Sequence, residues 1–184
     1  MTIYIVDIEP VESRYTAQWK EHLPKQLTAK CKQEVITVSG GDTPQMTTPG
    51  AFLNFAGTNV YKSTQAIKIA EMFAADEVKD GDHFIFTDAW NSTIVQLKYM
   101  ADLLGKSITI HGLWHAGSYD PADFLGRLIG DAKWVRHAER SMFECYDHNY
   151  FATEFHIRMF GRSHKVGNVQ DKIVQTGWPM EYMK

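Results

Sequence analysis

Two histidines in this sequence have the residue type and the position for acid–base chemistry. His111 and His115 follow residues 107–110, a short run that we expect to form a strand. Imidazole titrates near neutral pH, so a histidine at the mouth of a strand suits hydrogen bonding or general base catalysis. A structural histidine that anchors the loop is the alternative.

The spacing of the two histidines also occurs in zinc sites, where both imidazoles lie on one face of a helix. Gly112 and the strand-like run before it indicate a loop instead, and no glutamate follows His111. We therefore expect no metal site. A small metal-dependent hydrolase built on His111, His115 and Asp120 is a third hypothesis.

A second candidate group follows residues 83–87, the most strand-like run of the chain. The group consists of Asp88, Trp90 and Asn91. A carboxylate beside an aromatic ring can hold a sugar or a base, because the oxygens accept hydrogen bonds while the ring covers the apolar side. The same residues also suit the N-terminal cap of a following helix, and the two roles are compatible.

Strand-like runs alternate with segments of helical pattern along the whole chain. We expect strands at 3–6, 34–38, 83–87, 107–110, 149–153 and 172–174. We expect helices at about 12–30, 63–79, 92–104, 122–129, 133–146 and 154–160, with a kink or a split at Pro24 in the first of them. This order predicts an α/β fold, namely a Rossmann-like parallel sheet with helices on both faces.

In such a sheet the ligand crevice lies beyond the carboxyl ends of the strands. Polar residues gather after four of the expected strands, at 7–9, 39–42, 88–91 and 111–115. Polar turns are common at strand ends. Four of them together, two carrying Trp or His, indicate a site.

Composition and charge exclude several classes of protein. The chain has 184 residues, 44% of them hydrophobic, which suits one domain spanning 1–184 with a real core. No apolar run approaches the roughly 20 residues that cross a bilayer, and the N-terminus lacks a secretory pattern. Cys31 and Cys145 show no disulfide or metal-type spacing. We expect a cytoplasmic protein that makes no membrane contact.

The net charge of −3 gives no support for a dedicated nucleic-acid binder, which would carry a basic excess. Three motifs of common enzyme classes are also missing. The first strand is not followed by G-x-G-x-x-G, and neither a phosphate-binding G-x-x-x-x-G-K-[ST] loop nor a G-x-S-x-G nucleophile elbow occurs. These absences disfavour a classical NAD enzyme, a P-loop kinase or ATPase, and a serine hydrolase.

Three further segments follow the order of a known fold family: ITIHGLW at 108–114, YDHNYFATEFH at 146–156 and KIVQTGWPM at 172–180. Together they resemble the N-terminal, acceptor-side domain of GT-B glycosyltransferases, most closely a group encoded by large tailed bacteriophages. Two features depart from the family pattern. Thr153 runs directly into Glu154 without a serine between them, and residues 9–15 lack the glycines that often approach the donor phosphate.

The resemblance implies a sugar transferase in which a C-terminal domain holds most of the nucleotide sugar. This chain ends where that domain would begin, so we expect it to be inactive without a missing domain or a partner chain. The domain itself is expected to bind no cofactor. The acceptor is a small molecule or a nucleic acid, such as a modified base of phage DNA in the host cytoplasm. The alternative is a non-catalytic nucleotide-fold module that captures a protein or a small ligand.

Within such an enzyme we expect His111 to line the reaction centre as the catalytic residue. Asp88 and Trp90 would hold the acceptor, and His115, Tyr119 and Asp120 would form a mobile lip of the site. The remaining predicted contacts are Asn91, Gly112, Trp114, Arg14 and Tyr15.

Overall fold

The fold was taken from a computed structural model, which describes residues 1–11, 16–43, 46–51, 53–166 and 170–177. The predicted contacts Arg14 and Tyr15 lie outside the described residues. Within the described part of the chain, no helix is long and apolar enough to cross a membrane.

Six parallel strands form one sheet, which confirms the predicted α/β, Rossmann-like fold. Their order is β2-β1-β3-β4-β5-β6. The chain leaves β1 toward β2 on one side and returns to β3 on the other, so the order of the strands reverses between β1 and β3. The strands are β1 (Thr2–Val6), β2 (Glu34–Val38), β3 (His83–Phe86), β4 (Thr109–Trp114), β5 (His148–Phe151) and β6 (Ile173–Gln175).

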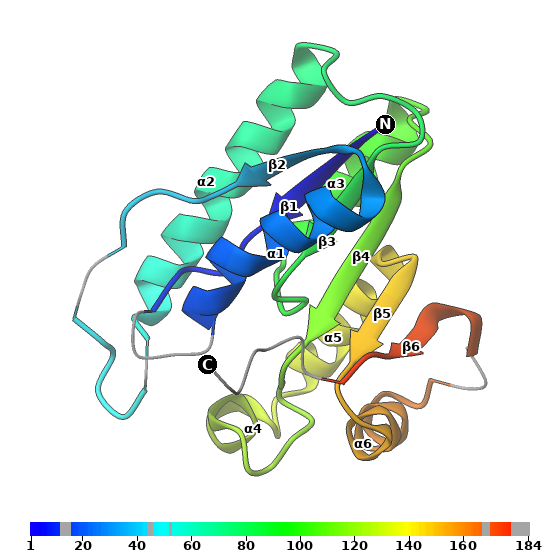
Figure 1. Cartoon of the computed structure of the whole chain (residues 1–184). Coiled ribbons are helices and arrows are strands. Elements are labelled where there is room, and N and C mark those ends of the chain that lie inside the picture. Colours follow the sequence, from blue (N-terminus) through cyan, green and yellow to red (C-terminus); the bar gives the residue numbers. More distant parts are fainter. Residues whose placement is uncertain (12–15, 44–45, 52, 167–169, 178–184) are drawn as a thin grey trace.

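The helices form two layers of unequal size, one on each face of the sheet (Figure 1). Helices α2, α3, α5 and α6 contact one another in sequence order and form one layer, whereas α1 packs against β2. Right-handed crossovers require this division, because only the β1–β2 connection runs in the opposite direction. The helices are α1 (Thr16–Cys31), α2 (Phe55–Ala74), α3 (Ile94–Leu103), α4 (Phe124–Ile129), α5 (Lys133–Cys145) and α6 (Glu154–His164), with a 3-10 turn η1 (Gln170–Lys172) before β6.

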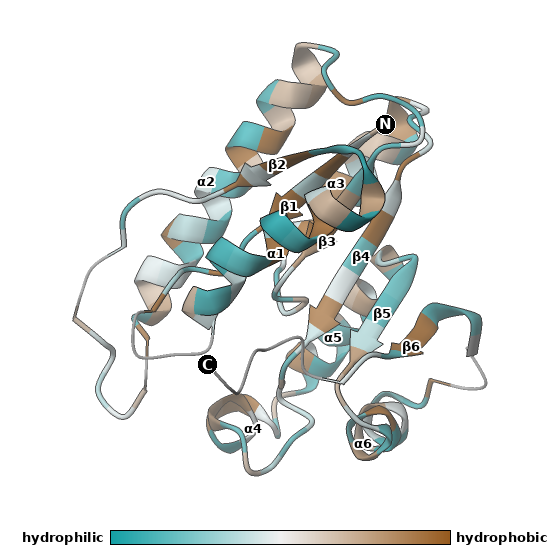
Figure 2. Cartoon of the chain, viewed as in Figure 1, coloured by the Kyte–Doolittle hydropathy of each residue, from teal (hydrophilic) through white to brown (hydrophobic). Residues whose placement is uncertain are grey.

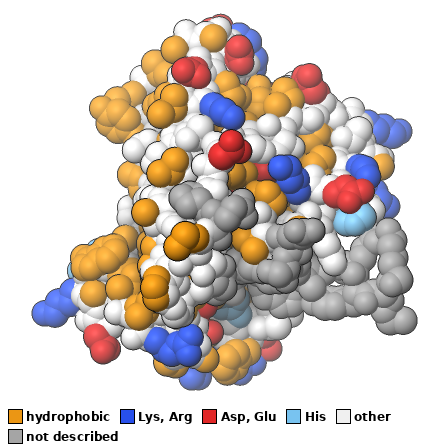
Figure 3. Space-filling model, turned by 90° about the vertical axis from the view of Figure 1, so that its left-hand side faces the viewer, with side chains coloured by type: hydrophobic (Ala, Val, Ile, Leu, Met, Phe, Trp, Pro, Cys, Tyr) orange, Lys and Arg blue, Asp and Glu red, His pale blue; other side chains and the backbone are white. Residues whose placement is uncertain are grey.

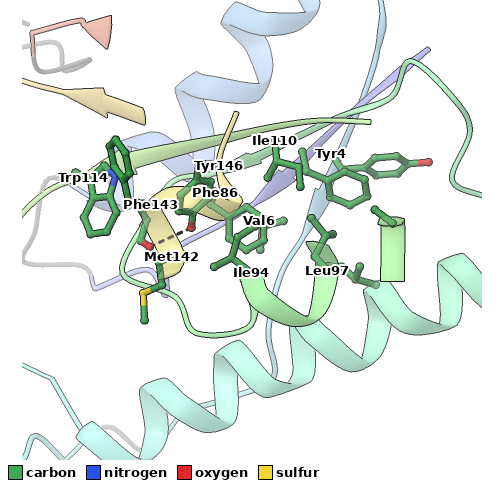
Figure 4. Close-up of a cluster of buried hydrophobic side chains, with 14 of the residues drawn as sticks. Tyr4, Val6, Phe86, Ile94, Leu97, Ile110, Trp114, Met142, Phe143 and Tyr146 are labelled. Atoms are coloured by element: carbon green, nitrogen blue, oxygen red, sulfur yellow. Dashed lines mark hydrogen bonds between the residues drawn. The ribbon is translucent and has the colours of Figure 1, made fainter. Parts of the chain in front are cut away.

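The main hydrophobic core lies between the sheet and the larger helix layer (Figure 4). Phe86 and Ile110 project from the sheet, while Leu97 of α3 and Phe143 of α5 project from the helices, and all four are buried. Tyr146 crosses this core, and its hydroxyl donates a hydrogen bond to the carbonyl of Ala89 at 3.0 Å. The core therefore ties the end of α5 to the segment that follows β3.

Strand β5 is more polar than the central strands β1 and β3 (Figure 2). Strands β1 and β3 carry mostly apolar side chains, in keeping with a position covered from both faces. Strand β5 reads HNYF and has half-buried and buried residues in alternation. One face of this end of the sheet is thus polar and partly open to solvent.

Several element boundaries differ from those expected, among them those of α2 and β4. Helix α2 begins at Phe55 rather than near residue 63, because the side chain of Asn54 caps it by accepting a hydrogen bond from the Gly57 N–H at 2.7 Å. Strand β4 continues to Trp114 instead of ending at Ile110. Pairing with β5 extends it, since His111 lies opposite His148 and Trp114 opposite Phe151.

Charged side chains of both signs are interspersed on the face shown in Figure 3. The described residues of that face form no single basic patch of the kind that guides a protein to nucleic acid.

Candidate functional site

A cavity of about 430 Å³ opens where β1, β3 and β4 end, at the point where the strand order reverses. Its walls come from the segments after these three strands, from the start of α2 and from α4. Most of the lining side chains are apolar, with a few polar groups among them, as is usual for a small-molecule site. The lining residues are Ile8, Glu9, Leu53, Phe55, Thr58, Asn59, Lys62, Asp88, Trp90, Ser92, His115, Ala116, Asp123, Phe124, Leu125, Leu128 and Ile129.

Asp88 and Trp90 both line this cavity, and Lys62 of α2 fixes them. The Lys62 ammonium donates to Asp88 Oδ2 and to the Trp90 carbonyl oxygen, each at 2.7 Å. The Trp90 N–H donates to Asp88 Oδ1 at 3.1 Å, which closes the turn. Both charged side chains are mostly buried, so this ion pair is screened less than one on the surface.

The indole of Trp90 is held from behind by Glu139, a residue of α5. Trp90 Nε1 donates to Glu139 Oε1 at 2.9 Å, and the Glu139 side chain is completely buried. The Ser118 N–H and hydroxyl also donate to this carboxylate, at 2.6 and 2.7 Å. His164 Nε2 lies 2.9 Å from Oε2, and Arg136 lies 3.6 Å away. The carboxylate therefore fixes the edge of the indole while its ring lines the cavity.

The protonation of this cluster follows from its hydrogen bonds. Burial acts to raise the pKa of Glu139, but the bonds donated by His164, Ser118 and Trp90 lower it below its usual value. His164 Nδ1 lies 3.0 Å from the Phe160 carbonyl and Nε2 faces the carboxylate, so both ring nitrogens meet acceptors. These two acceptors hold the His164 imidazole in one orientation against the Glu139 carboxylate.

His115 occupies the mouth of β4 and lines the cavity. Its Nε2 lies 2.6 Å from the Thr87 carbonyl, and because a carbonyl only accepts, this nitrogen carries a proton. Its ring also packs on the Trp19 ring of α1, at 4.8 Å between centroids. These contacts hold the imidazole in one orientation beside Asp88 and Trp90.

The expectation that His111 lies at the mouth of its strand beside Asp88 and Trp90 is wrong. His111 lies inside β4 and is not among the cavity residues. It stacks between His83 of β3 and His148 of β5, with Nε2 at 3.0 Å from His83 Nδ1 and Nδ1 at 2.9 Å from the Tyr150 hydroxyl. Burial, followed by the two neighbouring histidines, lowers its pKa to about 4, so it is neutral at pH 7.

Gly112, Trp114 and Tyr119 were expected to contact a substrate, and the structure places them in the core instead. A Cβ on Gly112 would come within 2.7 Å of the Tyr146 ring, so this glycine allows close packing. Trp114 is buried and donates from Nε1 to Asn149 Oδ1 at 2.8 Å. Tyr119 is buried too, so it forms no mobile lip, and its hydroxyl lies 2.6 Å from His156 Nε2.

Two further predicted contacts, Asn91 and Asp120, make local hydrogen bonds outside the cavity lining. Asn91 Oδ1 accepts from the N–H and hydroxyl of Thr93, which orders the turn before α3, and Asp120 accepts from the N–H of Ala122. No three His, Cys, Asp or Glu side chains in the described ranges are grouped to hold a metal ion. The hydrolase built on His111, His115 and Asp120 therefore has no metal centre there.

A buried group of hydrogen bonds surrounds Asp7, the residue before the cavity residue Ile8. The Ser39 hydroxyl and the Tyr61 hydroxyl donate to the Asp7 carboxylate at 2.7 and 2.6 Å, and Gln65 Nε2 donates to it at 2.9 Å. Burial raises the pKa of Asp7, and these bonds oppose the rise. Gln65 also bonds the carbonyls of Asp7 and Val38, so the ends of β1 and β2 are locked to α2.

Sequence reasoning did not single out Lys62, Glu139 or Glu9 as site residues. Lys62 and Glu139 lie in helices, at some distance along the chain from Asp88. Lysine and glutamate are common residues of solvated helices, so nothing in the sequence marks these two. Glu9 carried a signal, because it stands in the polar segment directly after β1.

No protein-family model matches this sequence, and no curated protein matches it either. The interpretation of the cavity therefore depends on its geometry and on the residues that line it.

Proposed function

We propose that this chain is the acceptor-side domain of a GT-B glycosyltransferase and that the cavity at the ends of β1, β3 and β4 holds the acceptor. A second domain or a partner chain would supply the nucleotide sugar. The observation that carries the proposal is the fixed group of Asp88, Lys62 and Trp90 in a cavity of about 430 Å³ at the reversal of strand order. Ligands of parallel α/β sheets bind at this position.

The lining offers a small acceptor what it needs for a defined orientation. Each oxygen of Asp88 already accepts one hydrogen bond, from Lys62 or from the Trp90 N–H, and a carboxylate oxygen has a second lone pair for a ligand hydroxyl. The Trp90 ring presents an apolar face to a sugar or a base. His115, rather than His111, would lie beside the acceptor, because it is the histidine of β4 that lines the cavity.

The test measures sugar transfer by this chain combined with a donor-binding half. Release of nucleoside diphosphate from a nucleotide sugar is followed with candidate acceptors, and acceptor binding is followed by calorimetry. Asp88→Asn and Trp90→Ala should each lower kcat/KM at least about tenfold, which corresponds to about 1.4 kcal/mol. His111→Gln is the matched control outside the cavity and should stay within about twofold. Equal losses in all three variants would refute the proposed site.

The second candidate is a non-catalytic binding module. The placement of His111 outside the cavity favours it, because the predicted catalytic imidazole is then not beside the ligand. Calorimetry separates the two functions. A module that binds its ligand in this cavity gives heat that Trp90→Ala removes, but it releases no nucleoside diphosphate with any acceptor.

A further inference from the structure

Glu9 places a buried carboxylate in the wall of the cavity. It follows β1 by a few residues, it is only 6% exposed, and it lines the cavity together with Ile8. Its Oε2 atom is buried and has no hydrogen-bond partner within the described part of the chain. A buried carboxylate oxygen without a donor is costly, so its presence in a cavity wall calls for a ligand group.

The other charged groups of the cavity are already engaged. Lys62 pairs with Asp88 at 2.7 Å. Asp123 accepts from the N–H of Leu125 at 2.9 Å, where it caps α4. The described lining residues thus include three carboxylates and one ammonium, and that ammonium is bonded to Asp88. Among these carboxylates, Glu9 has a buried oxygen with no partner in the described part of the chain.

We propose that the cavity selects a ligand with a protonated amine on an apolar or aromatic body, and that Glu9 binds this amine. The inference depends on the proposed function only in treating this cavity as the ligand site. An ammonium supplies a hydrogen-bond donor and also neutralises the charge, whereas a hydroxyl supplies the donor alone. The rings of Phe55 and Phe124, stacked at 5.6 Å between centroids, give the body of the ligand an apolar wall.

The experiment compares two probes of nearly the same shape on the complete chain. Benzylamine carries the ammonium and benzyl alcohol carries a hydroxyl in its place, and both are titrated at pH 7 by two-dimensional amide NMR. The variants are Glu9→Gln, which removes the charge in the cavity, and Glu71→Gln, which removes the same charge from the exposed surface of α2. Thermal unfolding of both variants without a probe shows that they are folded.

Benzylamine should bind the unmodified chain at least about tenfold more tightly than benzyl alcohol, because its ammonium forms a charge-assisted hydrogen bond with the carboxylate and a hydroxyl does not. Glu9→Gln should remove this preference, and Glu71→Gln should keep it. Equal binding of the two probes, a preference that survives in Glu9→Gln, or shifts confined to residues outside the cavity would each overturn the proposal. The outcome is separate from sugar transfer: amine binding without transfer refutes the proposed function alone, and transfer with no preference for amines refutes this inference alone.

Discussion

Replacing Glu139 by Gln tests the idea that a buried carboxylate holds Trp90 in place. The change keeps the size of the side chain and removes its charge. In the structure this carboxylate accepts from Trp90 Nε1, from both donors of Ser118 and from His164 Nε2, all within 2.9 Å. A glutamine can keep its oxygen toward Trp90 and the Ser118 N–H. Its amide group then takes the place of Oε2 and faces the Ser118 hydroxyl and His164 Nε2.

The expected cost follows from the contacts at Oε2, where the Ser118 hydroxyl and His164 meet an amide group instead of a carboxylate oxygen. A hydrogen bond to a charged group contributes about 1.5–3 kcal/mol, so the loss of these two costs about 3–5 kcal/mol. This is a large part of the roughly 5–15 kcal/mol that stabilises a typical domain. Glu139→Gln should therefore lower the free energy of unfolding by about 3–5 kcal/mol. Glu144→Gln is the matched control on the same helix, because its exposed carboxylate only meets Lys172 at 3.3 Å and should cost less than about 1 kcal/mol.

The assay is urea unfolding followed by tryptophan fluorescence, repeated between pH 7 and pH 3.5. The pKa of Glu139 is lowered in the folded chain, so the stability that its ionised form contributes is present above pH 4.5 and is lost as the pH falls below that value. In Glu139→Gln, the free energy of unfolding should lack this part of the decrease at low pH. A change of less than about 1 kcal/mol at pH 7, with an unaltered indole N–H resonance of Trp90, would refute the reasoning.

Two further predictions concern the residues that the structure moved away from the cavity. Gly112→Ala should lower the free energy of unfolding by about 1–3 kcal/mol in calorimetry, because the new methyl group would lie within 2.7 Å of the buried Tyr146 ring. Gly161→Ala meets no atom within 4 Å and serves as its control, so equal effects of the two changes would contradict the packing argument. His111 has a pKa lowered to about 4, so the chain should lose stability as the pH falls from 6.5 toward 4, by about 2 kcal/mol at pH 5 from this residue. His111→Gln should show a smaller loss over the same range in urea unfolding, and an unchanged pH profile would contradict the assigned burial.

The fold class could be predicted from the sequence because the residue types of the central strands reflect their burial. Runs such as residues 3–6 and 84–86 are apolar throughout, as is typical of strands covered on both faces. The aspartate and tryptophan after β3 could also be placed near a ligand site. Residues that directly follow a parallel strand lie at the carboxyl edge of the sheet, where ligands bind.

The extent of β4 could not be predicted in this way. Its last four residues, HGLW, include a glycine and a histidine that do not favour a strand by themselves. Pairing with β5 outweighs this preference, because His111 and Trp114 find partners opposite them. Once the strand continues, His111 turns to the face of the sheet and His115 takes its place at the edge. Because β4 ends a few residues later than expected, His115 and not His111 lies at the edge of the sheet.

What the sequence determined by itself is local: which segments are strands, that they run parallel, and which polar residues follow them. Only the tertiary structure decided which side chains meet in the cavity. Lys62 reaches Asp88 from α2, Glu139 reaches Trp90 from α5, and Glu9 Oε2 lies buried with no donor among the residues that the structure describes. These facts depend on how the helices pack against the sheet. Contacts between residues far apart in the chain leave no pattern in a single sequence, since each partner occurs equally well on a solvated helix.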